Sequence, residues 1–394
     1  MTRQLFLRHL APTSPAPMGL EIERGAHIYL YDTAGKRYID LISGIGPSVL
    51  GHQHAAVTAA IHAQTDRYLH TLVYGEFVLQ PQVQLATLLA QYLPPQLSST
   101  YLTSSGTEAT EGAMKLAKRA TGKRKIVSCR NAYHGSTQGA MSLMSDPFFT
   151  QAYRPLLPDI EHITFNNIEE IKNISCRTAA VIVETVQGEA GVIVPENDYL
   201  LRLREHCTHI GALLIFDEIQ AGIGRTGSLF AFEQYGVVPD ILLLAKGLGG
   251  GMPIGAFVAS NELMNLFTHN PVLGHITTFG GHPVSAAAAV AMLQTITHDD
   301  CALVRSAKAK ENIIKNTLQH AKIKALRTAG LWAAVDLGSF DKVQKVIAAC
   351  LQKGVITDWF LFNDHSIRIA PPLVITDAEL RQALELLLEA IDEL

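Results

Sequence analysis

The chain has 394 residues, of which 48% are hydrophobic and only 17% are charged, so it can bury a large core and does not resemble a disordered protein. Its 32 Lys and Arg residues against 36 Asp and Glu residues give a formal net charge of −4, and this balance argues against a nucleic-acid partner. We find no signal peptide and no apolar run of about 18 residues, and the five cysteines are scattered; we therefore expect a cytoplasmic protein with no membrane partner and reduced thiols.

The chain begins with a β pattern and then changes to alternating strands and helices. Residues 27–41 alternate around the turn Thr33-Ala34-Gly35, which predicts a β-hairpin. After Gly51, short apolar runs alternate with helical patterns. The runs are continuously apolar, as expected for strands of a parallel sheet that are buried on both faces. They cover residues 126–128, 179–183, 212–216 and 241–245.

The C-terminal segment returns to a β pattern at residues 366–370 and then becomes helical. Thr376 and Glu379 form a capping box for the last helix. Its predicted inner face consists of Leu380, Leu384, Leu387, Leu388 and Ile391. The sequence therefore predicts an α/β protein with a large central domain over residues 55–275 and a smaller α+β domain. Residues 1–54 and residues 276–394 would both contribute to the smaller domain.

Acidic residues and a lysine follow three successive predicted strands. Glu184, Asp217 and Lys246 each come directly after an apolar run, and glycines lie near each of them. Ligands of an open parallel sheet bind at the carboxyl ends of its strands. Any one of these residues could be a solvated loop charge, but three in the same position predict a binding site.

Lys246 stands between the apolar run 241–245 and the glycine-rich segment 247–251. Such a place offers little solvation to an ammonium group, and desolvation lowers the pKa of a lysine. A neutral amine is the form that reacts with carbonyl groups. A structural lysine here would need a buried partner, so we favour a catalytic lysine.

Residues 103–108 form a candidate phosphate site. This segment, Thr-Ser-Ser-Gly-Thr-Glu, joins a predicted strand to a helix, and its hydroxyl residues and glycine leave free N–H groups at the helix N-terminus. The same pattern alone would also be typical of an ordinary helix cap.

Two further patterns are weaker. Residues 222–227 match the dinucleotide fingerprint G-x-G-x-x-G, but residues 217–221 separate them from the preceding predicted strand and no helical pattern follows. His52 and His54 lack further ligands nearby, so we predict turn residues and no metal site.

These segments together resemble the class III aminotransferases, which are pyridoxal-phosphate enzymes of fold type I, over nearly the whole chain. The resemblance is strongest to the acetylornithine and ornithine branch. The motifs that carry it are Ser105-Gly106-Thr107-Glu108-Ala109, Tyr133-His134-Gly135, residues 184–191, residues 214–220, Ala245-Lys246-Gly247, residues 277–281 and residues 367–372.

The resemblance implies a large, mostly parallel mixed sheet, pyridoxal 5'-phosphate as cofactor, and a role for each matched residue. Lys246 would be the Schiff-base lysine and the proton-transferring base, and Asp217 would keep the pyridine nitrogen protonated. Glu189 and Arg368 would form a pair that opens to admit a substrate carboxylate. The remaining implied cofactor contacts are Ser105, Gly106, Thr107, Tyr133, His134, Gln220 and Thr278, the last of these across a homodimer interface.

One position departs from the acetylornithine and ornithine pattern. An arginine that binds the substrate α-carboxylate follows the aromatic-His-Gly motif there, whereas this chain has Ser136. A serine cannot form a bidentate charged contact. Arg368 is the first candidate to replace it and Arg154 the second, and Thr277 is a further implied substrate contact.

We therefore expect an aminotransferase that moves an amino group from an amino acid or amine to a 2-oxo acid such as 2-oxoglutarate or pyruvate. An aminomutase, racemase or decarboxylase could use the same scaffold, and an isomerase would need no added acceptor. The third hypothesis is a cofactor-free interaction protein, against which the set of Asp217, Gln220 and Lys246 argues. The expected assembly is a homodimer, or a tetramer made of two such dimers.

Overall fold

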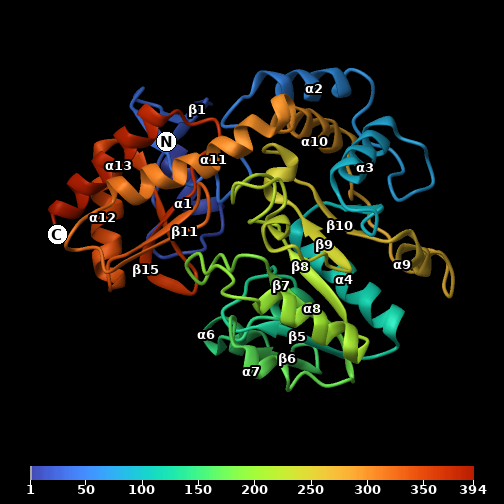
Figure 1. The fold of residues 1–394 in the computed structure, drawn as a ribbon. Helices are drawn as coiled ribbons and strands as arrows, with labels where there is room; N and C mark the ends of the chain where they lie inside the picture. Colours follow the sequence, from blue (N-terminus) through green and yellow to red (C-terminus); the bar gives the residue numbers. More distant parts are fainter. Residues whose placement is uncertain (1) are drawn as a thin grey trace.

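The structure is a computed structural model that describes residues 2–394. Its fold is built around one seven-stranded sheet (Figure 1). In sheet order its strands are β4 (Ser99–Thr103), β10 (Gly255–Ala259), β9 (Ile241–Leu244), β8 (Leu213–Asp217), β7 (Thr178–Glu184), β5 (Lys125–Cys129) and β6 (Ile160–Ile163). Neighbouring strands from β9 to β6 are parallel, and β10 is antiparallel to both β4 and β9. The predicted mixed, mostly parallel sheet is confirmed.

Helices cover both faces of this sheet. Side chains alternate along β7, so Ala180 and Ile182 pack with the apolar face of α4 (Gly106–Thr121), whereas Val181 and Val183 pack with α8 (Tyr199–Ile210). All seven residues of β7 are buried, which explains its continuously apolar sequence. The central strands therefore end at fixed positions between two helical layers.

The two ends of the chain lie side by side at one end of the molecule, where Figure 1 draws them in blue and red. The N-terminal sheet contains β1 (Ile22–Ala26), β2 (Tyr29–Asp32) and β3 (Arg37–Asp40). Strand β13 (Val355–Ile356), from the C-terminal part of the chain, extends this sheet by pairing in parallel with β3. A third sheet has the order β11 (Ala325–Thr328), β12 (Ala333–Asp336), β15 (Asn363–Ile369) and β14 (Asp358–Phe360).

The remaining helices pack around these sheets. Helix α10 (Pro283–Ile296) packs against α2 (Ala55–Thr65) and α3 (Gln80–Tyr92), and α12 (Phe340–Lys353) packs against α13 (Asp377–Asp392). The others are α1 (Thr2–His9), α5 (Gln138–Met141), α6 (Pro147–Thr150), α7 (Ile168–Ile171), α9 (Asn261–Asn265) and α11 (His298–Thr317). Of the helices described, none combines the length and hydropathy that crossing a bilayer requires.

Local sequence signals located several elements correctly. The predicted hairpin is β2 and β3, and the predicted capping box is present at α13, where the hydroxyl of Thr376 accepts from the Glu379 N–H at 3.2 Å. Leu388 of the predicted inner face is only half-buried, and Ala383 and Ala390 complete the buried stripe. Residues 222–227 form turns between β8 and the short 3₁₀ helix η2 (Ala231–Tyr235).

Candidate active site

A cavity of about 640 Å³ lies at the carboxyl ends of β7, β8 and β9. Its walls bring together segments from across the chain, because each strand delivers the residue that follows its buried run to the same edge of the sheet. The predicted site residues that line it are Ser105, Gly106, Thr107, Tyr133, His134, Ser136, Glu184, Asp217, Gln220 and Lys246.

Asp217 ends β8 and is almost completely buried. Its Oδ2 pairs with Nδ1 of His134 at 2.7 Å, and its Oδ1 accepts the N–H of Ile219 at 2.9 Å. Both oxygens therefore have a fixed partner, so the carboxylate faces the cavity in one orientation. His134 Nε2 has no hydrogen-bond partner within residues 2–394.

Glu184 ends β7 directly beside Asp217, since the two are paired in the parallel register of β7 and β8. Its Oε1 accepts the N–H of Gly188 at 3.1 Å, while Oε2 is buried without a partner in the described chain. Burial raises the pKa of Glu184 well above its ordinary value, and the neighbouring charge of Asp217 adds to this effect. The protonated form of Glu184 is therefore favoured at this position beside Asp217.

Lys246 opens the short 3₁₀ helix η3 (Lys246–Gly249) immediately after β9. Its backbone has a φ of +45°, a left-handed conformation that costs a non-glycine residue about 1–3 kcal/mol. The Nζ atom donates to Oε1 of Gln220 at 2.7 Å. Burial lowers the pKa of Lys246, although the charge of Glu189 partly opposes this, so the neutral amine becomes more accessible.

The N-terminus of α4 forms one wall of the cavity. The hydroxyl of Ser105 caps the helix by accepting the Glu108 N–H, so the first-turn amides of Gly106 and Thr107 have no helical carbonyl to bind. A Cβ atom on Gly106 would lie 2.8 Å from Cδ1 of Ile219, so a larger residue would narrow the site here. The geometry suits an anion such as phosphate.

A hydrogen-bond chain that the sequence analysis missed fixes this wall. The hydroxyls of Thr107 and Thr137 are 2.6 Å apart, and Thr137 donates to Oε1 of Glu111 at 2.6 Å. The same carboxylate oxygen accepts the N–H groups of Gly139 and Ala140. Glu111 therefore ties the segment around Ser136 to α4. In the sequence, the position of Glu111 one helical turn after Glu108 was the only local indication of this role.

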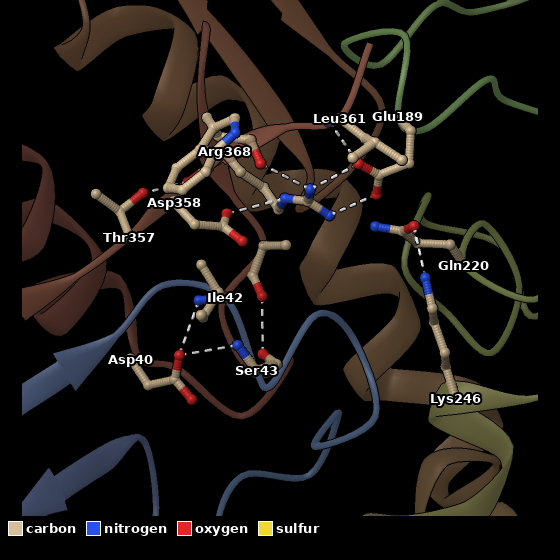
Figure 2. A network of polar contacts seen from close by, with 12 residues as sticks. Asp40, Ile42, Ser43, Glu189, Gln220, Lys246, Thr357, Asp358, Leu361 and Arg368 are labelled. Atoms are coloured by element: carbon tan, nitrogen blue, oxygen red, sulfur yellow. Dashed lines mark hydrogen bonds and ion pairs between the residues drawn. The ribbon is translucent and has the colours of Figure 1, made fainter. Parts of the chain in front are cut away.

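Glu189 and Arg368 form a buried bidentate pair beside the cavity (Figure 2). Both N–O distances are 2.9 Å, and Arg368 also donates to the carbonyl of Trp359 at 3.0 Å. A second carboxylate, from Asp358, lies 3.0 Å from Nε of Arg368. The sequence analysis named the first pair but missed Asp358. In Figure 2 the Gln220 side chain lies between Glu189 and Lys246.

The loop after β3 closes the other side of the site, as Figure 2 also shows. Asp40 accepts the N–H groups of Ile42 and Ser43, and the Ser43 hydroxyl donates to the carbonyl of Ala370 at 2.7 Å. Ala370 follows the strand that carries Arg368, and Pro47 of this loop lines the cavity. The two ends of the chain are thus joined at the active site.

Comparison with known proteins places this site in a family. Residues 11–391 match the model of the family Aminotransferase class-III. The chain is 39% identical to the acetylornithine aminotransferase of Methanopyrus kandleri, covering 97% of this chain and 96% of that one, and 38% identical to the putrescine aminotransferase of Pectobacterium atrosepticum, covering 90% and 79%. The solved ornithine aminotransferase of Toxoplasma gondii superposes with a TM-score of 0.89 at 30% identity, covering 99% and 94%.

This chain belongs to the class III aminotransferases. It therefore has the fold of the type I pyridoxal-phosphate enzymes, and it is a pyridoxal-phosphate-dependent aminotransferase that acts on an amino donor and a 2-oxo acid. The expected family, fold, activity and cofactor are confirmed.

The cavity of this aminotransferase fits pyridoxal phosphate. Free amides at α4 face one end of the cavity, where a phosphate would bind, and the buried carboxylate of Asp217 and the amine of Lys246 line the rest. A Cβ atom on Gly135 would collide with Thr107, so the backbone there approaches the phosphate end closely. The residue types match the phosphate, the ring nitrogen and the aldehyde of the cofactor.

The remaining predicted substrate and cofactor residues lie at the mouth of the cavity or outside it. Ser136 is exposed at the cavity mouth, where its hydroxyl lies 3.0 Å from that of Tyr133. Arg154 is exposed and does not line the cavity. Thr277 and Thr278 also lie outside it, in a loop beside Leu102.

Proposed function

We propose that this aminotransferase prefers donors that have a distal or ω-amino group and no α-carboxylate. The observation that supports this is the charge of the cavity lining. Among its lining residues Lys246 is the only lysine or arginine, and Ser136 stands where related enzymes carry the arginine that binds an α-carboxylate. Arg368, the nearest alternative, is already paired with two carboxylates.

In this proposal each residue at the strand ends has one task. Bound pyridoxal phosphate supplies an electron-withdrawing ring that stabilises negative charge on the substrate carbon. Asp217 would face the ring nitrogen and favour its protonated form, and Gln220, which accepts the hydrogen bond from Lys246, would lie near the ring oxygen. Lys246 would hold the cofactor and, as a neutral amine, could accept and return the substrate proton. Gly106 and Thr107 would bind the phosphate through their N–H groups.

Acetylornithine is a second candidate donor. The specific observation in its favour is the 39% identity to an enzyme named acetylornithine aminotransferase over nearly the full length of both chains. Under this alternative Arg368 would have to bind the α-carboxylate after Glu189 moves away.

A donor panel separates the two candidates. We expect kcat/KM for an ω-amino acid or simple amine to exceed that for acetylornithine and ornithine by about tenfold or more, because a bidentate arginine contact is worth a few kcal/mol. Ser136→Arg should raise activity with acetylornithine, and Ser136→Ala, which only removes the hydroxyl, should not. Efficient use of acetylornithine by the unmodified enzyme, with little effect of Arg368→Ala, would contradict the proposal.

A further inference from the structure

Arg368 is held by more negative charge than it can neutralise. Glu189 binds its terminal nitrogens and Asp358 lies 3.0 Å from its Nε. No other Lys, Arg or His within residues 2–394 forms an ion pair with either carboxylate. With all three groups ionised, this buried cluster carries one net negative charge.

Asp358 adds a second negative charge beside the guanidinium. Its Oδ1 lies 3.0 Å from Nε of Arg368, while Glu189 and the carbonyl of Trp359 bind the two terminal nitrogens. Burial raises the pKa of Asp358 to about 6, with Glu189 adding to the rise and Arg368 opposing it. The carboxylate is therefore still ionised under the mildly alkaline conditions of a typical assay.

The cluster lies close enough to the reacting amine to influence the donor. Figure 2 places Glu189 next to Gln220, which in turn accepts the hydrogen bond from Lys246. The charges of Glu189 and Arg368 also act on the pKa of Lys246. A donor whose amine reaches Lys246 can therefore place its other end near this cluster.

We propose that Asp358 is a specificity-determining residue that makes the Arg368 end of the site favour a distal ammonium group over a distal carboxylate. The donor class is then a short α,ω-diamine. A cation entering the site is attracted by the excess charge. An anionic donor end must displace Glu189, as the carboxylate of the 2-oxo acid acceptor must in its own half-reaction, and it still experiences repulsion from Asp358 and from the displaced glutamate. Asp358 therefore biases the donor, while the acceptor still binds through Arg368. This inference rests on the proposed function, because it specifies the charge at the far end of the donor that the proposed function leaves open.

The test uses three donors with four carbon atoms each, which differ in the far end: 1,4-diaminobutane, 1-aminobutane and 4-aminobutanoate. In the holoenzyme at about pH 8, where Asp358 is ionised, we expect kcat/KM to fall in that order. Asp358→Asn should reduce the preference for the diamine over the amino acid on the order of tenfold. The substitution should change the donor preference mainly through KM, because the reacting amine of each donor is the same.

A binding measurement complements the kinetics. Butanoate has the carboxylate but no amine, and its calorimetric affinity should increase in Asp358→Asn. Asp364→Asn, an exposed neighbour on β15, should change neither measurement and serves as the matched control. An unchanged donor ratio, or weaker butanoate binding in Asp358→Asn, would overturn the inference. Turnover with acetylornithine far above all three donors would instead contradict the proposed function.

Discussion

At the scale of single residues, Lys246 illustrates how position creates reactivity. The amine lies among buried groups, and its hydrogen bond goes to the neutral amide of Gln220, while Glu189 is held by Arg368. Burial therefore lowers the pKa of Lys246. Neutral lysine is the nucleophile and the base that amino transfer needs, so the proposed chemistry is prepared before the substrate binds.

Lys246→Ala should abolish transamination. The expected loss is at least about 100-fold, because a positioned general base contributes this much or more. Borohydride reduction followed by peptide mapping should place the bound cofactor on Lys246. Lys172→Ala removes an exposed lysine at the C-terminal end of α7. This substitution should leave turnover and labelling unchanged. Label on a different lysine would show that the assignment is wrong.

At the scale of elements, the register of β7 and β8 creates a pair of unequal acids. It places Glu184 and Asp217 side by side, but only Asp217 has His134 as a partner. Two adjacent buried charges of the same sign are unfavourable, so one group keeps its proton. Burial and the neighbouring charge of Asp217 together raise the pKa of Glu184, so the protonated form of Glu184 is more favourable than in an exposed glutamate.

The infrared spectrum tests this division of roles. The wild-type holoenzyme should have a carbonyl band of a protonated carboxyl group at about pH 8, well above the ordinary pKa of a glutamate, and Glu184→Gln should remove it. In Asp217→Asn the same group should ionise at a pH lower by one unit or more, because the neighbouring charge is gone. Glu161→Gln, at an exposed carboxylate, provides the control. If the wild type and Glu184→Gln had the same spectrum, Glu184 would be ionised.

At the scale of the whole molecule, an exposed apolar surface points to an assembly. It includes Val78, Val272, Phe279, Phe77 and Ile276, whose exposed fractions run from 93% to 50%. Surfaces of this kind are typical of interfaces between subunits. The loop 277–281 borders it, while Thr278 lies outside the cavity of its own chain. We therefore propose a homodimer in which Thr278 reaches the partner's phosphate site.

Thr278→Ala should weaken the affinity for pyridoxal phosphate by about tenfold or more, the value of one hydrogen bond to a charged group. Equilibrium titration of the apoenzyme measures this, and sedimentation measures the assembly. Thr208→Ala, an exposed threonine on α8, should have no effect on either. A fully active monomer at assay concentration, or unchanged cofactor affinity, would contradict the shared site.

The local pattern of the chain determined the catalytic framework. Buried strands of a parallel sheet must be apolar, and the polar residues that follow them must meet at one edge, so Glu184, Asp217 and Lys246 could be brought together by reasoning from sequence. The capping box of α13 and the hairpin of β2 and β3 were likewise visible, because each depends on residues only a few positions apart.

Only the tertiary structure decided which charges face one another. Asp358 meets Arg368 because β14 and β15 pair in antiparallel fashion, whereas the pair of Arg368 and Glu189, 179 positions apart, was expected only from the family resemblance. Thr137 and Glu111 meet because α4 packs beside the loop after β5. Such contacts depend on register and packing between distant segments, which leave no periodic signal in the chain. The sequence by itself thus determined the fold and the reacting groups, whereas packing decided their protonation and the charge that the donor encounters.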